Sequence, residues 1–189
     1  MRRLAVYCGS NMGTDPAFAD TARRLGEEMA KRSIELVYGG GRLGLMGVVA
    51  DAVLGAGGKA HGVIPQALID LEVAHSGLTE LHVVATMHER KARMTELTDA
   101  FVALPGGIGT FDELFEAWTW NALGYHAKPF GLLNVGGFWD GMLGFLDTAT
   151  RSGFMSPARR AQLLVASDIA GVIEMLAEAA GAAEKKMTW

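Results

Sequence analysis

The segment Ala100-Phe-Val-Ala-Leu-Pro-Gly-Gly-Ile-Gly-Thr-Phe-Asp-Glu113 passes from an apolar run, through a glycine-rich turn, into a helical pattern. The run predicts a buried strand, and the glycines allow the backbone to turn sharply. A helix that begins directly after such a turn presents backbone N–H groups and roughly half a positive charge to a ligand. The segment therefore predicts a phosphate-binding turn, although a turn with a purely structural role explains the glycines equally well.

The same alternation of short apolar runs and longer amphipathic stretches continues along nearly the whole chain. The apolar runs predict strands at residues 4–8, 35–38, 59–64, 81–84, 100–104, 130–134 and 163–166. Helices are expected at residues 16–31, 45–54, 87–97, 110–123, 139–151 and 169–179, with Asp15 as one N-cap and Ser167 or Asp168 as another. We expect residues 1–189 to form one α/β domain of the doubly wound, Rossmann-like class. Its sheet would be mostly parallel, with about seven strands and helices on both faces.

Composition limits the possible partners and the location. The chain has 189 residues, a formal charge of −4 and a single cysteine, Cys8. The acidic balance argues against nucleic acid as a partner, and one cysteine allows no internal disulfide. The apolar run after Arg3 ends at Gly9, too soon for the roughly 7–15 residues of a signal-peptide core. No stretch approaches the roughly 18 apolar residues of a membrane span, so no membrane partner and a cytoplasmic location are expected.

Three glycine-rich or small loops follow predicted strands: residues 9–11, 39–44 and 105–109. In an open parallel sheet, ligands bind outside the carboxyl ends of the strands, so Ser10, Gly40 and Gly41 are candidates for the same site as the 105–109 turn. The glycine spacing from Gly39 does not match the dinucleotide pattern G-x-G-x-x-G, and no G-K-[ST] follows any of the loops. A full NAD site and a Walker A phosphate loop are therefore disfavoured.

Charged residues cluster beside two of the predicted helix starts. Glu113 lies one turn after Thr110, and Met87, Arg90, Lys91 and Met94 share one face of the predicted helix 87–97. An arginine near Glu113 would offset the repulsion between this carboxylate and a phosphate. Two alternatives remain at this stage: an acidic residue that only complements the helix dipole, and a solvated basic helix whose methionines pack against the core.

Histidine, cysteine and serine give no further site. The histidines at 61, 75, 82, 88 and 126 show no ligand-like spacing to one another or to carboxylates. We therefore expect no metal site and no cofactor. Cys8 is interpreted as a buried thiol, and no G-x-S-x-G motif indicates a serine nucleophile.

Two motifs together carry a family resemblance. Met87-His-Glu-Arg-Lys91 and Pro105-Gly-Gly-Ile-Gly-Thr-Phe-Asp-Glu113 closely resemble the LOG family of cytokinin riboside 5′-monophosphate phosphoribohydrolases, long mislabelled as lysine decarboxylases. Tyr7-Cys-Gly-Ser10, Gly39-Gly-Gly-Arg-Leu-Gly-Leu-Met-Gly47 and Lys128-Pro-Phe-Gly-Leu-Leu-Asn134 are also similar to family segments, so the resemblance covers most of the chain. No lysine sits in a recognisable pyridoxal phosphate site, which argues against a decarboxylase.

The resemblance implies an activity and a set of residues. The activity is hydrolysis of the N-glycosidic bond of a nucleoside 5′-monophosphate, with N6-substituted AMP as the substrate class and AMP as a second candidate, by a homodimer. The catalytic residues would be Arg90 and Glu113. With the loop residues above, the expected substrate-binding residues are Ser10, Gly40, Gly41, Glu72, Met87, Lys91, Gly106, Gly107, Ile108, Gly109, Thr110 and Thr119. Thr119 lies about 120° from Glu113 around the helix, so it would contribute from another direction, across the dimer interface.

Two other functions remain open at this point. Related Rossmann-like proteins bind nucleotides or molybdopterin-type cofactors without hydrolysing them, which makes a carrier protein the main alternative. A DNA-binding relative is disfavoured by the acidic net charge.

Overall fold

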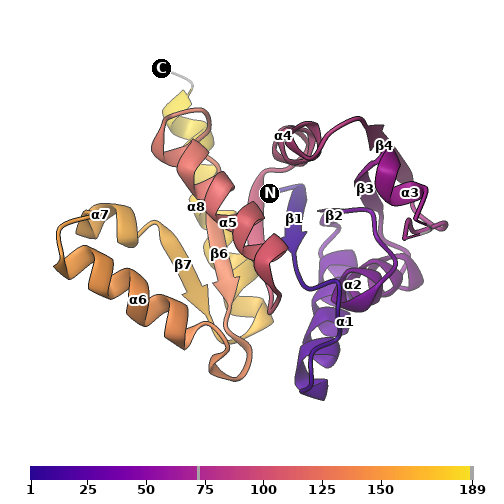
Figure 1. Cartoon of the computed structure of the whole chain (residues 1–189), viewed down its shortest axis with the longest axis horizontal. Coiled ribbons are helices and arrows are strands. Elements are labelled where there is room, and N and C mark those ends of the chain that lie inside the picture. The colour runs from indigo at the N-terminus through magenta and orange to yellow at the C-terminus, as the bar shows by residue number, and fades with distance from the viewer. Residues whose placement is uncertain (72, 188–189) are drawn as a thin grey trace.

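The computed structural model describes residues 1–71 and 73–187, with side chains up to residue 183. Within this part of the chain, seven strands form one parallel sheet with helices on both faces (Figure 1). The strands are β1 (Arg3–Tyr7), β2 (Glu35–Tyr38), β3 (Ala60–Pro65), β4 (Glu80–Val84), β5 (Ala100–Ala103), β6 (Phe130–Leu133) and β7 (Leu163–Ala166). The helices are α1 (Pro16–Lys31), α2 (Gly44–Gly55), α3 (Gln66–Ile69), α4 (Met87–Leu97), α5 (Ile108–Ala122), η1 (Val135–Gly137), α6 (Asp140–Arg151), α7 (Pro157–Arg160) and α8 (Ile169–Met187).

The strand order places a ligand-binding position at the centre of the sheet. The order is β4-β3-β2-β1-β5-β6-β7, and every neighbouring pair is parallel. The chain winds outward in one direction from β1 to β4 and in the other direction from β5 to β7. Strand order therefore reverses between β1 and β5, and the loops that follow these two strands diverge to opposite faces. Such a switch point is where open α/β sheets bind their ligands.

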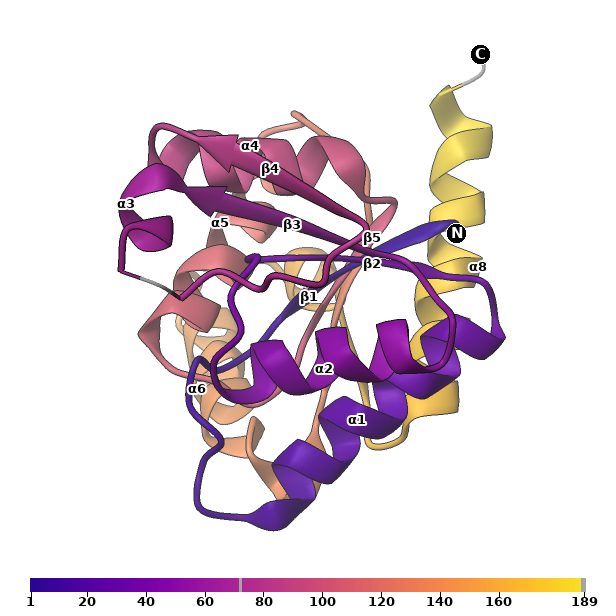
Figure 2. The same cartoon turned by 90° about the vertical axis from the view of Figure 1, so that its right-hand side faces the viewer.

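Two hydrophobic clusters cover the two faces of the sheet, and β1 contributes to both. Leu4 and Val6 pack with buried residues of α1, α2 and α8, whereas Ala5 and Tyr7 pack with buried residues of α4, α5 and α6. This division follows from the two-residue repeat of a strand, in which successive side chains point to opposite faces. Figure 2 shows α1 and α2 together on one side of the strands and α4 and α5 on the other. Burial on both faces fixes the central strands, and with them the loops at their ends.

The sequence-based prediction of a doubly wound α/β fold with about seven strands is confirmed. The bounds of β2, β7, α1 and α4 agree with the predicted ranges. Asp15 caps α1 by accepting a hydrogen bond from the amide of Ala17, and Asp168 accepts one from Gly171 at the start of α8. That residues 1–189 form a single domain stays a prediction.

Three differences from the sequence-based prediction have physical reasons. Helix α5 begins at Ile108 and not at Thr110, because the extended backbone of Gly107 serves as the N-cap. Helix α8 continues past the predicted end at residue 179 to Met187, since a single glycine inside a helical pattern is tolerated. The one-turn helices α3 and α7 were not predicted, because four residues are too few to show a helical period.

Candidate active site

A cavity of about 620 Å³ lies where the loops after β1, β2 and β5 meet, at the predicted end of the sheet. Its lining comes from these loops and from the starts of α2 and α5, with further side chains from α1, β3, α3, α4 and Phe138. Residues that line it are Cys8 to Gly13, Phe18, Gly39, Gly41, Leu43, Leu45, Met46, Ile64, Leu68, Val73, Arg90, Pro105 to Thr110, Glu113 and Phe138. The volume is within the range of roughly 300–1,000 Å³ typical of small-molecule sites.

Close packing of the three loops depends on glycine. The amide of Gly9 donates to the carbonyl of Pro105 at 3.1 Å, and the amide of Leu45 donates to the carbonyl of Gly9 at 3.0 Å. Gly44 has a φ of +59°, and a Cβ at this position would lie 2.3 Å from the carbonyl carbon of Ser10. A side chain at residue 44 would therefore push the first two loops apart and distort the floor of the cavity.

Two helix N-termini face the cavity without a side-chain cap. The N-caps are Gly107 for α5 and Leu43 for α2, and neither makes a side-chain capping hydrogen bond within the described part of the chain. By contrast, α4 is capped by Thr86, whose hydroxyl accepts a hydrogen bond from the amide of Glu89. Helix N-termini without a side-chain cap offer backbone N–H groups and a positive dipole end to an anion. At α2 the amide of Leu45 is already bonded to Gly9, so the start of α5 is the better phosphate position. The cavity thus suits a phosphate.

Arg90 is held in the cavity wall by backbone groups. Its Nε donates to the carbonyl oxygen of Val63 at 3.1 Å, and its Nη2 donates to the carbonyl oxygen of Gly39 at 3.2 Å. A Cβ on Gly39 would lie 1.8 Å from Nη2, so only glycine at residue 39 leaves room for the guanidinium. The remaining nitrogen, Nη1, lies 3.0 Å from Oε1 of Glu113. Strands β2 and β3 therefore fix the arginine that faces the carboxylate.

Glu113 is a buried carboxylate in the first two turns of α5, with a side chain only 11% exposed. Burial raises the pKa of its carboxyl to about 6, while the positive charge of Arg90 opposes the rise and nearby Asp112 adds to it. At neutral pH the group is largely ionised yet close to its pKa. A carboxylate in this state can stabilise developing positive charge or accept a proton.

Apolar side chains form much of the remaining cavity wall. Phe18 and Phe138 meet edge to face, with ring centroids 5.7 Å apart, and Met46, Ile64 and Leu68 also line the cavity. Cys8 lines it as well, and burial raises the pKa of its thiol well above the ordinary value, so it remains a neutral thiol as expected. The cavity therefore combines an anion-binding end, an Arg–Glu pair and an apolar surface fit for a flat base.

Many of the residues predicted from sequence meet at this cavity. Those that line it are Ser10, Gly41, Arg90, Gly106, Gly107, Ile108, Gly109, Thr110 and Glu113. Gly40, Met87, Lys91 and Thr119 are not among its lining residues in the described part of the chain. Glu72 lies outside the described residues. The apolar wall was not predicted, because Phe18, Leu68 and Phe138 come from segments without a site-like motif.

Lys91 and Thr119 point elsewhere. The ammonium group of Lys91 pairs with Glu116 and, at 3.0 Å, with Asp112 on the outer side of α5. The hydroxyl of Thr119 donates to the carbonyl oxygen of Phe115 at 2.7 Å. Thr119 borders a separate depression of about 290 Å³, together with Trp118, Phe154 and Arg159. Within one chain, neither side chain completes the site around Glu113.

Known proteins resemble this chain over most of its length. The family model described as "Possible lysine decarboxylase" matches residues 46–176. The probable cytokinin riboside 5′-monophosphate phosphoribohydrolase LOGL9 of Oryza sativa subsp. japonica is 48% identical over 94% of this chain and 78% of its own length. The cytokinin riboside 5′-monophosphate phosphoribohydrolase of Rhodococcoides fascians is 46% identical over 91% of this chain and 87% of its own.

The chain belongs to the LOG family. In Arabidopsis thaliana, the LOG family member named LOG2 is 45% identical over 94% of this chain and 83% of its own length. The family model is described as "Possible lysine decarboxylase", whereas these relatives are named as phosphoribohydrolases. Among the described residues, no lysine lines the cavity; Arg90 lines it, and Lys91 on the same helix pairs outside the lining.

Solved structures share the fold of this LOG family member at low sequence identity. The molybdenum cofactor binding protein of Rippkaea orientalis has a TM-score of 0.71 at 22% identity and covers 93% of this chain and 95% of its own. The DNA processing protein A of Helicobacter pylori has a TM-score of 0.60 at 15% identity and covers 93% of this chain and 80% of its own. At these identities the likeness establishes the Rossmann-like fold alone.

Proposed function

We propose that this LOG family member hydrolyses the N-glycosidic bond of a nucleoside 5′-monophosphate to the free base and ribose 5-phosphate. The substrate class is N6-substituted AMP, such as isopentenyladenosine monophosphate, with AMP as a second substrate. The observation that carries the proposal is the Arg90–Glu113 pair, buried in a cavity that also receives two uncapped helix N-termini. Relatives 45–48% identical are named as phosphoribohydrolases of this kind.

The cavity offers a position for each part of the substrate. The phosphate fits the start of α5, where residues 107–110 present backbone N–H groups. The base fits the apolar wall of Phe18, Met46 and Phe138. The ribose then lies between them, beside Glu113. This arrangement uses the binding energy of the phosphate to hold the anomeric carbon at the carboxylate, which is how remote contacts assist a reaction.

The chemistry follows from the charge that develops on the sugar. As the bond between C1′ and N9 breaks, its electron pair leaves with the base and C1′ acquires oxocarbenium character. The Glu113 carboxylate stabilises this positive charge and accepts a proton from the water that forms the new bond to C1′. Arg90 keeps the carboxylate in place through its own bonds to Gly39 and Val63. The proton taken from water balances the charge of the departing base, so that once it has been passed on the products are the neutral free base and ribose 5-phosphate and Glu113 is again a carboxylate.

We also propose that the protein works as a homodimer in the cytoplasm. Large apolar side chains near Thr119 are exposed: Phe154 is 91% exposed, Tyr125 is 76% exposed and Leu123 is 66% exposed. A second copy of the chain would cover this surface and bring Thr119 near a neighbouring site. Sedimentation of the wild type and of Phe154→Ser tests the dimer: two copies are expected only for the wild type.

The proposed location rests on a separate observation. A lone cysteine suits a reducing compartment. Over the described residues, no helix has the length and apolar character to cross a bilayer.

Base release from a panel of substrates tests the activity. The panel contains AMP, isopentenyladenosine monophosphate and the two corresponding nucleosides, with ribose 5-phosphate or ribose measured as the second product. We expect both monophosphates to be hydrolysed and the nucleosides to react at least about 100-fold more slowly, since they lack the phosphate that positions the sugar. Tight binding of the monophosphates without base release would contradict hydrolysis and favour a nucleotide or molybdopterin-type carrier.

A further inference from the structure

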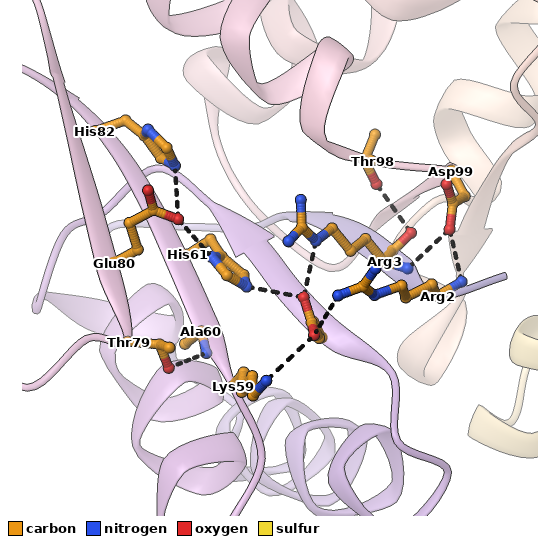
Figure 3. A network of polar contacts seen from close by, with 11 residues as sticks. Arg2, Arg3, Lys59, Ala60, His61, Thr79, Glu80, His82, Thr98 and Asp99 are labelled. Atoms are coloured by element: carbon orange, nitrogen blue, oxygen red, sulfur yellow. Dashed lines mark hydrogen bonds and ion pairs between the residues drawn. The ribbon is translucent and has the colours of Figure 1, made fainter.

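Figure 3 shows a charged cluster whose residues come from the amino-terminal parts of β1 to β4, whereas the cavity lies beyond the carboxyl ends of the strands. Its centre is Glu35, the first residue of β2, which contacts Arg3, Lys59 and His61. In the parallel register of β3 and β4, His61 faces Glu80, and His82 follows Glu80 by two residues on the same face of β4. Two imidazoles and a carboxylate thus meet at an edge of the sheet.

The ring of His61 lies between two carboxylates. Its Nε2 is 3.0 Å from Oε2 of Glu35, and its Nδ1 is 3.3 Å from Oε2 of Glu80. A neutral imidazole carries only one N–H, so donation from Nε2 to Glu35 leaves the lone pair of Nδ1 facing the Glu80 carboxylate. Two electron-rich atoms in this arrangement require a proton or a metal cation between them.

His82 approaches the same oxygen of Glu80. Its Nε2 lies 3.3 Å from Oε2 of Glu80 in a contact that lacks hydrogen-bond geometry, and this enclosed nitrogen makes no hydrogen bond within the described part of the chain. Figure 3 shows the rings of His61 and His82 on either side of the Glu80 carboxylate. A buried polar atom without a hydrogen-bond partner destabilises the folded protein. A ligand bound by all three side chains would give this nitrogen a partner.

We propose that Nδ1 of His61, Oε2 of Glu80 and Nε2 of His82 bind a divalent transition-metal ion, with Zn²⁺ as the fitting ion. The three atoms lie within 4.8 Å of one another. Zinc binds imidazole nitrogen and carboxylate oxygen at about 2.0–2.2 Å in tetrahedral geometry, which separates neighbouring ligand atoms by about 3.3 Å. Both contacts to Glu80, from His61 and from His82, have this spacing. Two nitrogens and one oxygen favour zinc over magnesium or calcium.

Glu35 provides the outer support that metal-binding histidines usually have. A histidine ligand commonly donates its second ring N–H to a carboxylate, which fixes the tautomer and makes the other nitrogen a better ligand. Nε2 of His61 has this partner in Glu35, and Glu35 is itself held by Nε of Arg3 at 2.8 Å. His61 is only 5% exposed, whereas Glu80 is 55% exposed, so water can take the fourth position from the open side.

The site is separate from the candidate active site and has a structural consequence. His61 lies three residues before Ile64, which lines the cavity, so their backbones on β3 are about 10 Å apart at roughly 3.3 Å per residue. The ion would join β3 to β4, which is an edge strand. We therefore infer that zinc stabilises this edge of the sheet and takes no part in the hydrolysis.

Zinc binding to the tag-free, chelator-stripped chain tests the proposal, with equilibrium dialysis and elemental analysis as the readout. We expect one equivalent of Zn²⁺ per chain for the wild type and loss of this equivalent in His82→Gln. In Glu35→Gln the affinity should fall about 10- to 100-fold. The matched control is His75→Gln, which removes another histidine paired with a carboxylate, Asp51, at 2.9 Å and should keep the full equivalent.

Two further measurements guard against a variant that fails to fold and a metal bound elsewhere. Zinc should raise the Tm of the wild type and of His75→Gln but not that of His82→Gln, whose circular dichroism should match the wild type. Cobalt in place of zinc should give the visible absorption of a tetrahedral site in the wild type and in His75→Gln but not in His82→Gln. Less than half an equivalent in the wild type, or equal binding in His82→Gln, would overturn the proposal.

Discussion

Two neighbouring cations of α4 pair with carboxylates of α5, Arg90 in an inner pair and Lys91 in an outer cluster. Arg90 faces Glu113 inside the cavity wall, whereas Lys91 faces Asp112 and Glu116 outside it. Burial raises the pKa of Glu113 to about 6, so that the inner carboxylate is held close to its point of protonation. Burial lowers the pKa of Lys91, but hydrogen bonds to Glu116 and Asp112 outweigh it and leave that pKa above its ordinary value.

The comparison shows which features separate a reactive pair from a supporting one. Lys91 pairs with two carboxylates, and Asp112 is 54% exposed, so water screens the negative charge that remains on this outer cluster. Arg90 uses two of its nitrogens on backbone carbonyls and meets one enclosed carboxylate. Because Arg90 is rigidly held and Glu113 lines the cavity, the Glu113 carboxylate can interact with positive charge on a bound substrate. The carboxylates of the outer cluster pair with Lys91 and do not line the cavity in the described part of the chain.

Removal of the inner cation should have the largest effect. Arg90→Ala leaves Glu113 buried and unpaired, so we expect base release to fall by about 10³-fold or more and unfolding free energy to drop by about 3–5 kcal/mol. Urea denaturation and the base-release assay measure the two effects. Arg93→Ala is the control, because it breaks the exposed pair with Glu96 on the same helix and should change neither quantity appreciably. Equal loss in both variants would contradict a special role for Arg90.

Displacement of the guanidinium without loss of its charge should have the next largest effect. In Gly39→Ala the new Cβ would lie 1.8 Å from Nη2 of Arg90, so the guanidinium must move. A displacement of about 1 Å costs about 100-fold in rate in such sites. Gly55→Ala, where a Cβ meets nothing within 4 Å, is the matched control and should keep full turnover. Normal turnover in Gly39→Ala would mean that the position of Arg90 is not critical.

Protonation of Glu113 should produce a moderate, graded effect. With a pKa of about 6, kcat/KM of the free enzyme should fall about tenfold per pH unit below pH 6, because the neutral carboxyl no longer stabilises positive charge. The pKa is raised in the folded state, so protonation between about pH 6 and pH 4.5 favours folding, and unfolding through this group cannot explain the loss. A rate that stays constant down to pH 5 would contradict this role of Glu113.

Disruption of the outer pair should have the smallest effect. Lys91→Met keeps the length of the side chain and removes the charge that pairs with Asp112 and Glu116. We expect turnover to change by less than about fivefold, which corresponds to the energy of a partly exposed ion pair. A loss of 100-fold, with nucleotide affinity reduced to match, would return Lys91 to the substrate-binding residues that the family resemblance implies.

The sequence predicts regular elements and contiguous motifs better than contacts across the fold. Helix α1 carries strong periodicity over its whole length, and the glycine loops lie at strand ends whose position the fold class dictates. Phe18 and Phe138 could not be assigned to the site, because they reach it from separate segments. The His61–Glu80–His82 cluster was missed for a related reason, since histidines 21 residues apart become neighbours only through the register of β3 and β4.

Turnover of Glu113→Gln beside Glu116→Gln tests the central claim most directly. Both variants remove one carboxylate charge from α5, one from the inner pair and one from the outer pair. We predict that single-turnover base release from isopentenyladenosine monophosphate falls by about 10³-fold in Glu113→Gln, with the nucleotide still bound, and by less than about fivefold in Glu116→Gln. Equal rates in the two variants, or full activity in Glu113→Gln, would contradict the assignment of Glu113 as the catalytic carboxylate.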